Sequence, residues 1–392
     1  MADSAESAQP PLPPLLVLGA EASLRAYQPL LSEHGVTTST MTGAAGRPPA
    51  LAGVLALDTA HQEDAARWAF RSQVPGNAPE AVRACLDKAI ATATLSTARV
   101  PTVQAIECDT AAEASRAAEW LSYPVVLRHP LPTPGSAARV ESPADLAAAW
   151  RLFDAPDSRQ PGRGVILSDE IPGPEVAVVY VSARGRHHGL AAIHRIHLGG
   201  TSLATLEDSC RAGDLCLQRT SDVAQQALNA LDVTSGLSQV RLRLTMQGPK
   251  VLSVTPGLTG DHAAQLVHLA TGVDVIRASV DIARGRTPNL GEQRRRCAAV
   301  RHMYPRTAGQ LYSHGVDPAL SQVAWLDRLH WPQPLGGLVE APRGGIEPVP
   351  LASVQVVGPD LDTVQDRLYR AVHAVEIRIA PLPGARNAGS AA

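Results

Sequence analysis

Short runs of apolar residues alternate with longer amphipathic segments in the first part of the chain. Residues 15–19 and 51–59 are apolar runs typical of buried strands, and the spacing of apolar positions at 21–34 predicts a helix. Residues 35–42 predict a further strand. Strands that alternate with helices favour a small parallel sheet. Gly19 follows the first strand without the other glycines of a dinucleotide-binding fingerprint, so that motif is absent.

Both kinds of pattern continue through the centre of the chain. Residues 165–171 and 175–197 form long alternating runs that are typical of antiparallel strands. Continuous helical patterns run from 79 to 97 and from 263 to 285. We also predict strands at 101–109 and 123–129, and two strands around a Gly-Pro turn at 239–258. Helices are predicted at 111–121, 142–153 (with Ser142 as the N-cap), 221–233 and 360–375.

Composition narrows the class of protein. The chain has 392 residues, of which 45% are hydrophobic, and can bury a sizeable core in two or three domains. We expect residues 1–14 and 381–392 to be disordered, because they cannot bury enough apolar surface. A net charge of −2 and a longest basic run at 294–296 give no general attraction to nucleic acid or to an anionic membrane. A small-molecule partner is therefore expected.

The cysteines and histidines give no strong metal motif. Five cysteines at irregular spacings include no CxxC pair, which argues against a disulfide framework and a structural zinc site. We predict that Cys210 and Cys216 lie in a loop with no other ligand nearby. His194 and His197 should point to opposite faces of a strand and not share an ion. Without a signal peptide or an apolar run of about 18 residues, a cytoplasmic protein is expected.

Four pieces of sequence occur in an order and spacing that resemble the ATP-grasp superfamily. They are LDK at 86–88, YPVVLRHPLPTPGSAARV at 123–140, VILSDEIPGPEVAVV at 165–179 and QVRLRLTMQGPKVLSVTPGLTGDH at 239–262. The N-terminal unit, and the C-terminal region that contains AAVRHMYPRTAGQL, are similar to the dipeptide-type, L-amino acid carboxylate–amine ligases. The resemblance covers residues 15–380.

The resemblance implies both a fold and a chemistry. The fold is α/β in three lobes: a Rossmann-like parallel-sheet domain at 15–84, an ATP-grasp domain at 85–285 with a lid near 122–185 and an antiparallel core, and an α+β lobe at 286–380. An ATP-grasp ligase activates a carboxylate as an acyl phosphate, which an amine then attacks. Mg²⁺ ions held by carboxylate and amide oxygens bridge the polyphosphate during this reaction.

Several positions match the nucleotide contacts that the resemblance implies. Lys88 and Arg128 take the places of two phosphate-contacting lysines, although an arginine is a forked cation and not a compact one. Residues 135–136 correspond to the flexible phosphate loop, and the hinge strand near 168–171 would hold adenine. The implied cofactor-binding residues are Lys88, Arg128, Gly135, Ser136, Asp169 and Ile171.

The three metal-ligand positions depart from the family's pattern. The resemblance places a glutamate at Arg241 and, twelve residues later, a Glu-x-Asn at Ser253 and Thr255. A guanidinium cannot ligate Mg²⁺, and at about 4 Å it would repel a divalent ion by several kcal/mol. We therefore do not expect Mg²⁺ to bind.

Two roles for Arg241 remain open. Because side chains alternate along a strand, Arg241 and Arg243 share a face and, with Arg128, would line the former catalytic cleft as a metal-free anion site. Alternatively, Arg241 pairs with Asp169 or Glu170 and fills a cleft that is no longer used.

We predict an ATP-grasp ligase-like protein whose Mg-ATP site has degenerated. It would be a pseudoenzyme, or would bind an acidic small molecule or nucleotide or assist a partner enzyme in amino-acid-derived natural-product biosynthesis. It would require no cofactor, although ATP could bind, and a homodimer is an option because family members are often dimers. The alternative is an active ATP-dependent carboxylate–amine ligase with metal ligands relocated, for example to Asp261 or Glu207. Different chemistry on the same scaffold is a third hypothesis.

Overall fold

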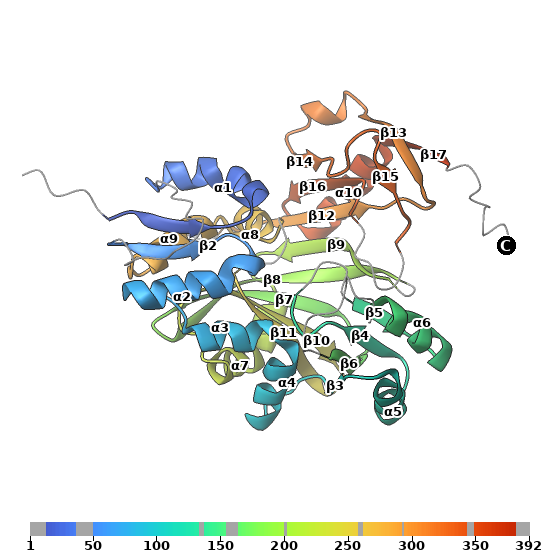
Figure 1. Ribbon diagram of the computed structural model, residues 1–392. Helices are drawn as coiled ribbons and strands as arrows, with labels where there is room; N and C mark the ends of the chain where they lie inside the picture. Colours follow the sequence, from blue (N-terminus) through green and yellow to red (C-terminus); the bar gives the residue numbers. More distant parts are fainter. Residues whose placement is uncertain are drawn as a thin grey trace, which may run out of the picture.

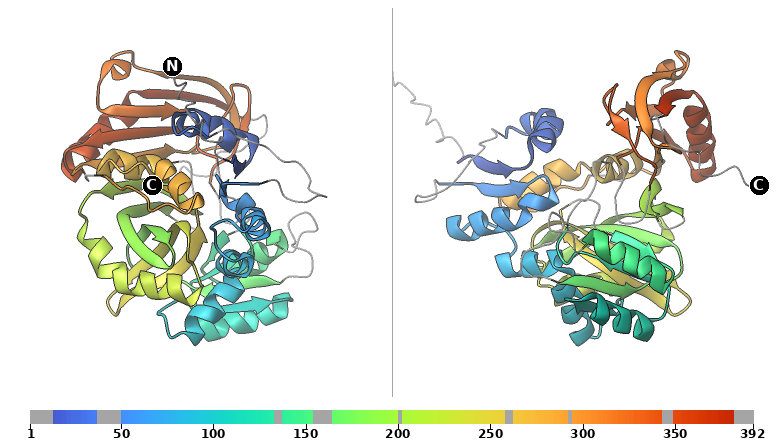
Figure 2. Two further views of the ribbon diagram at one scale, coloured as in Figure 1. Left: turned by 90° about the vertical axis from the view of Figure 1, so that its left-hand side faces the viewer. Right: turned by 45° about the vertical axis from the view of Figure 1, so that its right-hand side comes forward.

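The computed structural model describes residues 13–36, 50–132, 137–153, 164–199, 202–257, 262–291, 294–342 and 349–381. A large antiparallel sheet lies at the centre, and three smaller units surround it (Figure 1, Figure 2). Most of the two ends predicted to be disordered, and most of the strand predicted at 35–42, lie outside the described residues. Among the residues that are described, no helix has the length and apolar character needed to cross a membrane.

The central sheet has eight strands. They are β7 (Glu175–Ala183), β8 (Arg186–Gly199), β9 (Ser202–Arg211), β10 (Gly236–Thr245), β11 (Gly248–Pro256), β12 (Cys297–Met303), β14 (Leu326–His330) and β16 (Ala352–Gly358). Their order is β11-β10-β7-β8-β9-β12-β16-β14, and each neighbouring pair is antiparallel. The β7–β8 hairpin confirms the antiparallel strands predicted at 175–197.

Helices cover both faces of this sheet. On one face lie α8 (Ala263–Thr271) and α9 (Val275–Ala283), and on the other lie α3 (Pro79–Leu86), α4 (Lys88–Thr97) and α7 (Leu215–Ala230). Apolar residues alternate along β7 between these two cores, so the strand is buried on both faces.

Two predicted helices are each divided in two. Residues 79–97 form α3 and α4, because the buried Asp87 side chain accepts hydrogen bonds from the backbone N atoms of Ala89 and Ile90 and so begins a new helix. Residues 263–285 form α8 and α9, because Gly272 ends α8 with a φ of +78° and Asp274 caps α9. The helix predicted at 221–233 begins earlier, at residue 215.

A separate four-stranded sheet lies beside the central one (Figure 1). Its strands are β3 (Ala105–Cys108), β4 (Val125–Arg128), β5 (Ala137–Val140) and β6 (Val165–Asp169), in the order β3-β6-β4-β5, and α5 (Ala111–Leu121) and α6 (Pro143–Phe153) pack against it. Ser142 caps α6 as predicted, since its Oγ accepts a hydrogen bond from the backbone N of Asp145 at 3.3 Å.

The N-terminal unit pairs β1 (Leu15–Leu18) with β2 (Gly53–Ala56) in parallel, next to α1 (Glu21–Glu33), η1 (Thr59–His61) and α2 (Gln62–Ser72). Gly53 allows close packing, because a Cβ there would lie 2.2 Å from the carbonyl oxygen of Ala283 in α9.

The C-terminal lobe contains a second small sheet and one long helix. Its elements are β13 (Gly309–Val316), η2 (Leu320–Gln322), β15 (Leu338–Val339), β17 (Val375–Pro381) and α10 (Leu361–His373), which packs on β12 and β16. Parallel and antiparallel sheets mixed with helices confirm the predicted α/β fold class.

Candidate functional site

A buried carboxylate organises the centre of the site. Glu175, the first residue of β7, has a side chain that is only 1% exposed. Its Oε1 accepts hydrogen bonds from Arg241 Nε at 2.9 Å and Nη2 at 2.5 Å. Its Oε2 accepts one from His197 Nε2 at 3.0 Å and lies 3.3 Å from Arg243 Nη2. Burial raises the pKa of Glu175, but the charge of Arg241 and the contact with His197 outweigh it and hold the pKa well below its usual range.

Strand register places the positions that the resemblance assigns to metal ligands on the neighbouring strands β10 and β11. Arg241 in β10 lies opposite Ser253 in β11, and Thr255 follows two residues along the same strand. On the other side of β10, Arg243 lies opposite Glu175 in β7. Since residues two apart share a face of a strand, both arginines project toward the same side of the sheet, as predicted.

The partner of Arg241 differs from the two that were predicted. Arg241 does pair internally, but with the β7 carboxylate and with neither Asp169 nor Glu170. Asp169 accepts a hydrogen bond from the backbone N of Gln104 at 2.8 Å. Glu170 accepts one from Arg139 Nε at 2.6 Å. Both predicted partners belong to the four-stranded unit, where local groups satisfy them.

Two further cations complete the site. The backbone N of Lys88, at the start of α4, donates to the carbonyl of Pro130 at 2.9 Å, just after Arg128 ends β4. Burial, and then the charges of Arg128 and Arg241, lower the pKa of Lys88 to about 7. Burial, and then the charge of Arg241, lower the pKa of Arg128 to about 10. The Nε of Arg128 is buried and has no hydrogen-bond partner within the described part of the chain.

We refer to Lys88, Arg128, Arg241 and Arg243 as the basic cluster. Glu175 is the carboxylate that lies among them, and its two oxygens are already held by Arg241, His197 and Arg243. The cluster therefore carries an excess of positive charge in a half-buried place, where charges are screened less than at the surface. Such a place attracts an anion. The Mg²⁺ ions implied by the fold do not fit it, because they need free hard oxygen ligands.

Of the other predicted nucleotide contacts, two lie outside the described residues and two lie at the end of β6 or just after it. Gly135 and Ser136 are among the residues that are not described. Asp169 ends β6, where burial raises its pKa, and Ile171 is buried two residues later. These two keep their predicted place at the hinge after β6, and their adenine-binding role stays a prediction.

Two residues were suggested as replacement metal ligands, Asp261 and Glu207. Asp261 is outside the described residues. Glu207 accepts hydrogen bonds from Arg301 Nε at 2.9 Å and Nη2 at 2.5 Å, and from Gln365 Nε2 at 2.5 Å. Because Gln365 belongs to α10, Glu207 serves the packing of that helix on the central sheet and is not free for a metal in the cleft.

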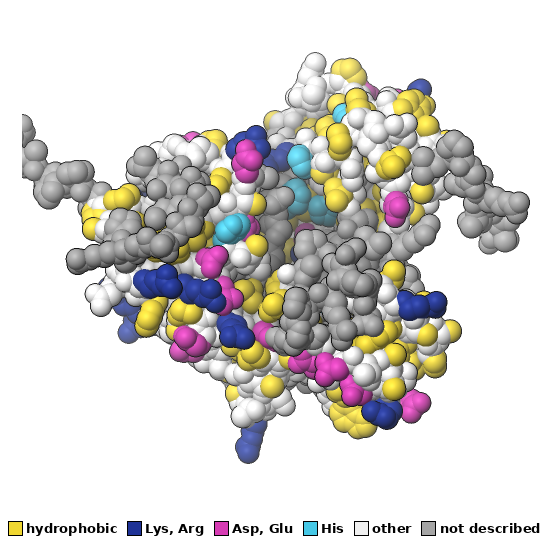
Figure 3. Space-filling model, viewed as in Figure 1, with side chains coloured by type: hydrophobic (Ala, Val, Ile, Leu, Met, Phe, Trp, Pro, Cys, Tyr) yellow, Lys and Arg dark blue, Asp and Glu magenta, His cyan; other side chains and the backbone are white. Residues whose placement is uncertain are grey.

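Sequence reasoning missed a group of polar residues that lie mostly on neighbouring strands of the central sheet. Figure 3 shows histidines in a hollow between the N-terminal unit and the C-terminal lobe. The rings of His262 and His302 are 5.2 Å apart, and His302 Nδ1 lies 2.8 Å from Ser353 Oγ. Burial, and then the neighbouring His262, lower the pKa of His302 to about 4. Arg195 donates two hydrogen bonds of 2.8 Å to the carboxylate of Asp208. The sequence signal for these residues was the alternation of apolar and polar positions along the strands that carry most of them.

The loop predicted for Cys210 and Cys216 is wrong. Cys210 is fully buried in β9, and Cys216 lies in the first turn of α7, where its backbone N donates to Asp214 Oδ1 at 2.8 Å. His194 and His197 contact different carboxylates, those of Asp214 and Glu175, which agrees with the prediction that they do not share an ion. All five cysteines are free.

Comparison of the sequence with known proteins finds a relative but no family model. No protein-family model matches the chain. It is 28% identical over 323 residues to the uncharacterized protein y4rH of Sinorhizobium fredii, a match that covers 79% of this chain and 64% of that protein. The chain therefore spans less than two thirds of the length of that relative.

Several solved structures superpose on nearly the whole chain. The L-amino acid ligase of Bacillus licheniformis matches with a TM-score of 0.76 and 16% identity, over 95% of this chain and 100% of that one. Phosphoribosylglycinamide synthetase of Anaerococcus prevotii matches with 0.68 and 14%, over 94% and 100%. Biotin carboxylase of Campylobacter jejuni matches with 0.65 and 14%, over 95% and 93%. The chain thus shares the fold of these three enzymes, which agrees with the predicted ATP-grasp fold.

Proposed function

We propose that this chain is a ligase-like protein without ligase activity, which uses the basic cluster as a metal-free site for an anionic small molecule. The observation that carries the proposal is the position of Arg241. The resemblance places a metal-binding carboxylate at the position of Arg241, which lies opposite Ser253. An ion pair with the buried Glu175 holds the guanidinium of Arg241 in this place.

Electrostatics argue against Mg²⁺ at this position. At an effective dielectric near 20, a unit charge and a divalent ion 4 Å apart repel each other by about 8 kcal/mol. Glu175 offsets only part of this repulsion, because its single negative charge faces the two positive charges of Arg241 and Arg243. Ser253 and Thr255 offer neutral hydroxyls in place of charged ligands.

The same charges favour an anion. Burial first, and then neighbouring guanidinium charges, lower the pKa values of Lys88 and Arg128, so an anion bound beside them would favour their charged forms. A phosphate or carboxylate group would supply that charge and could accept hydrogen bonds from the forked guanidinium of Arg128. We therefore propose a nucleotide or another acidic small molecule as the ligand, held for a role other than ATP-driven amide formation, such as assisting a partner biosynthetic enzyme.

Calorimetric titration with ATP, ADP and pyrophosphate, each with and without Mg²⁺, tests this proposal. We expect binding in the absence of Mg²⁺ that weakens when Mg²⁺ is added, because the metal neutralises the phosphate charge that the cluster would contact. The variant Arg128→Gln should bind roughly tenfold more weakly or worse. The exposed Arg116 of α5 provides a matched control, and Arg116→Gln should bind as the wild type does.

The ligase alternative predicts the opposite metal dependence. Tight binding that requires Mg²⁺, followed by release of ADP when amino acids are added, would refute the proposal and support an active carboxylate–amine ligase. Absence of binding for all the anions tested, with and without Mg²⁺, would also count against the anion site.

A further inference from the structure

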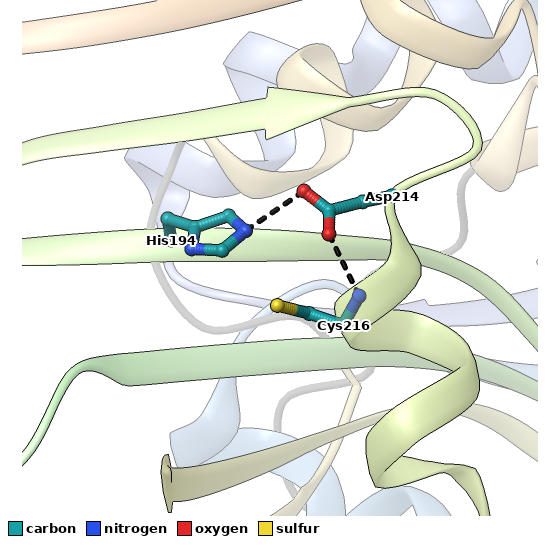
Figure 4. Close-up of side chains that lie close together, drawn as sticks. All are labelled: His194, Asp214 and Cys216. Carbon is teal, nitrogen blue, oxygen red and sulfur yellow. Dashed lines mark hydrogen bonds and ion pairs between the residues drawn. The ribbon is translucent and has the colours of Figure 1, made fainter.

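A further polar group lies at the beginning of α7 (Figure 4). His194 comes from β8, Asp214 is the N-cap of α7, and Cys216 is the second residue of that helix. One potential ligand atom from each of the three lies within 4.8 Å of the other two. His194 Nε2 lies 2.8 Å from Asp214 Oδ2, and Figure 4 shows the imidazole and the thiol converging beside the carboxylate.

We propose that His194, Asp214 and Cys216 form a binding site for a thiophilic divalent metal ion of the zinc class. The donor set decides the class of ion, because a thiolate and an imidazole select zinc-like ions over Mg²⁺ and Ca²⁺. Three protein ligands leave one tetrahedral position for water. The imidazole is 35% exposed and the carboxylate 5%, so the site opens to solvent on one side while the helix cap fixes the other.

The imidazole and the carboxylate need only a small change in separation to receive the ion, and the Cys216 sulfur, now within 4.8 Å of the other two ligand atoms, would settle about 3.6 Å from them. With metal–ligand distances near 2.0–2.1 Å, two ligands of a tetrahedral ion lie about 3.3 Å apart. The present separation of 2.8 Å between His194 Nε2 and Asp214 Oδ2 would therefore widen by about half an ångström. A half-exposed imidazole at the sheet surface can make that shift without disturbing the core.

The charges and protons of the binding step balance. As the metal–sulfur bond forms, the Cys216 thiol releases its proton to solvent, and the proton on the bonded nitrogen of His194 passes to its other ring nitrogen through water. A thiolate, a carboxylate and a divalent ion then sum to zero charge. Arg211 Nη2, now 3.6 Å from Asp214 Oδ2, belongs to a side chain that is 50% exposed and can turn away.

This site is independent of the basic cluster. His194 lies opposite Val176, whereas its neighbour Arg195 lies opposite Glu175, so His194 projects to the other face of the central sheet. A bound ion would connect β8 to the beginning of α7. Its presence or absence therefore does not depend on the function proposed above.

Binding of Zn²⁺ and Co²⁺ to the full chain without an affinity tag tests the site. Competition against a chelating dye should give one tight zinc site, and Co²⁺ should produce a thiolate-to-cobalt charge-transfer band. His194→Ala and Cys216→Ser should each weaken zinc binding by more than about 100-fold. His188→Ala, an exposed position on the same strand, and Cys108→Ala, a buried thiol elsewhere, should bind zinc as the wild type does.

A further variant separates loss of ligation from loss of folding. Cys216→Asp keeps an oxygen ligand, so it should retain weakened zinc binding while the sulfur-to-cobalt band disappears. Thermal melting in the presence of a chelator should be the same for this variant and the wild type. Zinc binding that is equal in the wild type, His194→Ala and Cys216→Ser, or a wild type without tight zinc binding or the sulfur band, would overturn the proposal.

Discussion

Replacement of Glu175 by glutamine tests the energetic basis of the site. The substitution keeps the size of the side chain but removes the charge that faces Arg241, Arg243 and His197. Removing one partner of a buried ion pair costs about 3–5 kcal/mol, because the remaining charge stays buried without compensation. Arg241 is 30% exposed and can partly turn to solvent, so we expect a loss near the lower limit, about 3 kcal/mol.

Urea unfolding at neutral pH measures this loss. The matched control is Glu170→Gln, because Glu170 also pairs with an arginine, Arg139, but is 25% exposed. Its removal should cost less than about 1 kcal/mol. A Glu175→Gln variant that loses no more stability than the control would refute the view that this carboxylate holds the arginines in place.

The pH dependence of the difference in unfolding free energy between wild type and Glu175→Gln gives a second test. The folded-state pKa of Glu175 lies below the value of about 4.3 expected in the unfolded chain. Its contribution to stability is thus fully present above that unfolded value and is lost as the pH falls toward the folded pKa. The difference in stability between wild type and Glu175→Gln should therefore stay constant near neutral pH and shrink below about pH 4. A difference that grows on acidification would contradict this assignment.

Three further predictions concern the basic cluster and its supports. The triple variant Arg241→Glu, Ser253→Glu, Thr255→Asn should gain Mg²⁺-dependent ADP binding by calorimetry, and no gain would show that the two strands no longer hold a metal-compatible geometry. Because the pKa of Lys88 is lowered to about 7, anion affinity should fall as the pH rises through that value and as the ammonium loses its charge. Lys88→Gln should bind more weakly with a flat profile over the same range, whereas identical profiles would exclude Lys88 from the site. Asp87→Ala should lower the free energy of unfolding by about 1–2 kcal/mol in urea, because two backbone N–H groups at the start of α4 lose their acceptor, and an unchanged midpoint would contradict the cap.

Local patterns predicted most of the fold, because the periodicity of a helix or strand depends only on residues that are close together in the sequence. Alternation identified the β7–β8 hairpin, and the helix 111–121 matches α5 residue for residue. The breaks at Asp87 and Gly272 were missed because the apolar pattern continues through both positions while the caps act on the backbone. Amphipathic periodicity reports the buried face of a helix and carries little information on where the chain interrupts it.

The site was predicted less completely because its contacts join distant segments. The register of Arg241 with Ser253 followed from a hairpin, which is local. The choice of Glu175 over Asp169 depends on which sheet each strand enters, since β6 ends in the four-stranded sheet and β7 begins in the central one. The contact of Cys216 with its neighbours likewise needs α7 to begin six residues before the predicted helix.

In the function proposed above, the guanidinium of Arg241 excludes divalent ions from the basic cluster. Electron paramagnetic resonance of Mn²⁺, added with a non-hydrolysable ATP analogue to the Cys216→Ser variant, tests it most directly, since that background removes the proposed zinc-class site. With the analogue in excess over both protein and Mn²⁺, we expect a Mn²⁺ spectrum that is the same with and without protein. A spectrum of Mn²⁺ ions bound jointly by the protein and the nucleotide would contradict it.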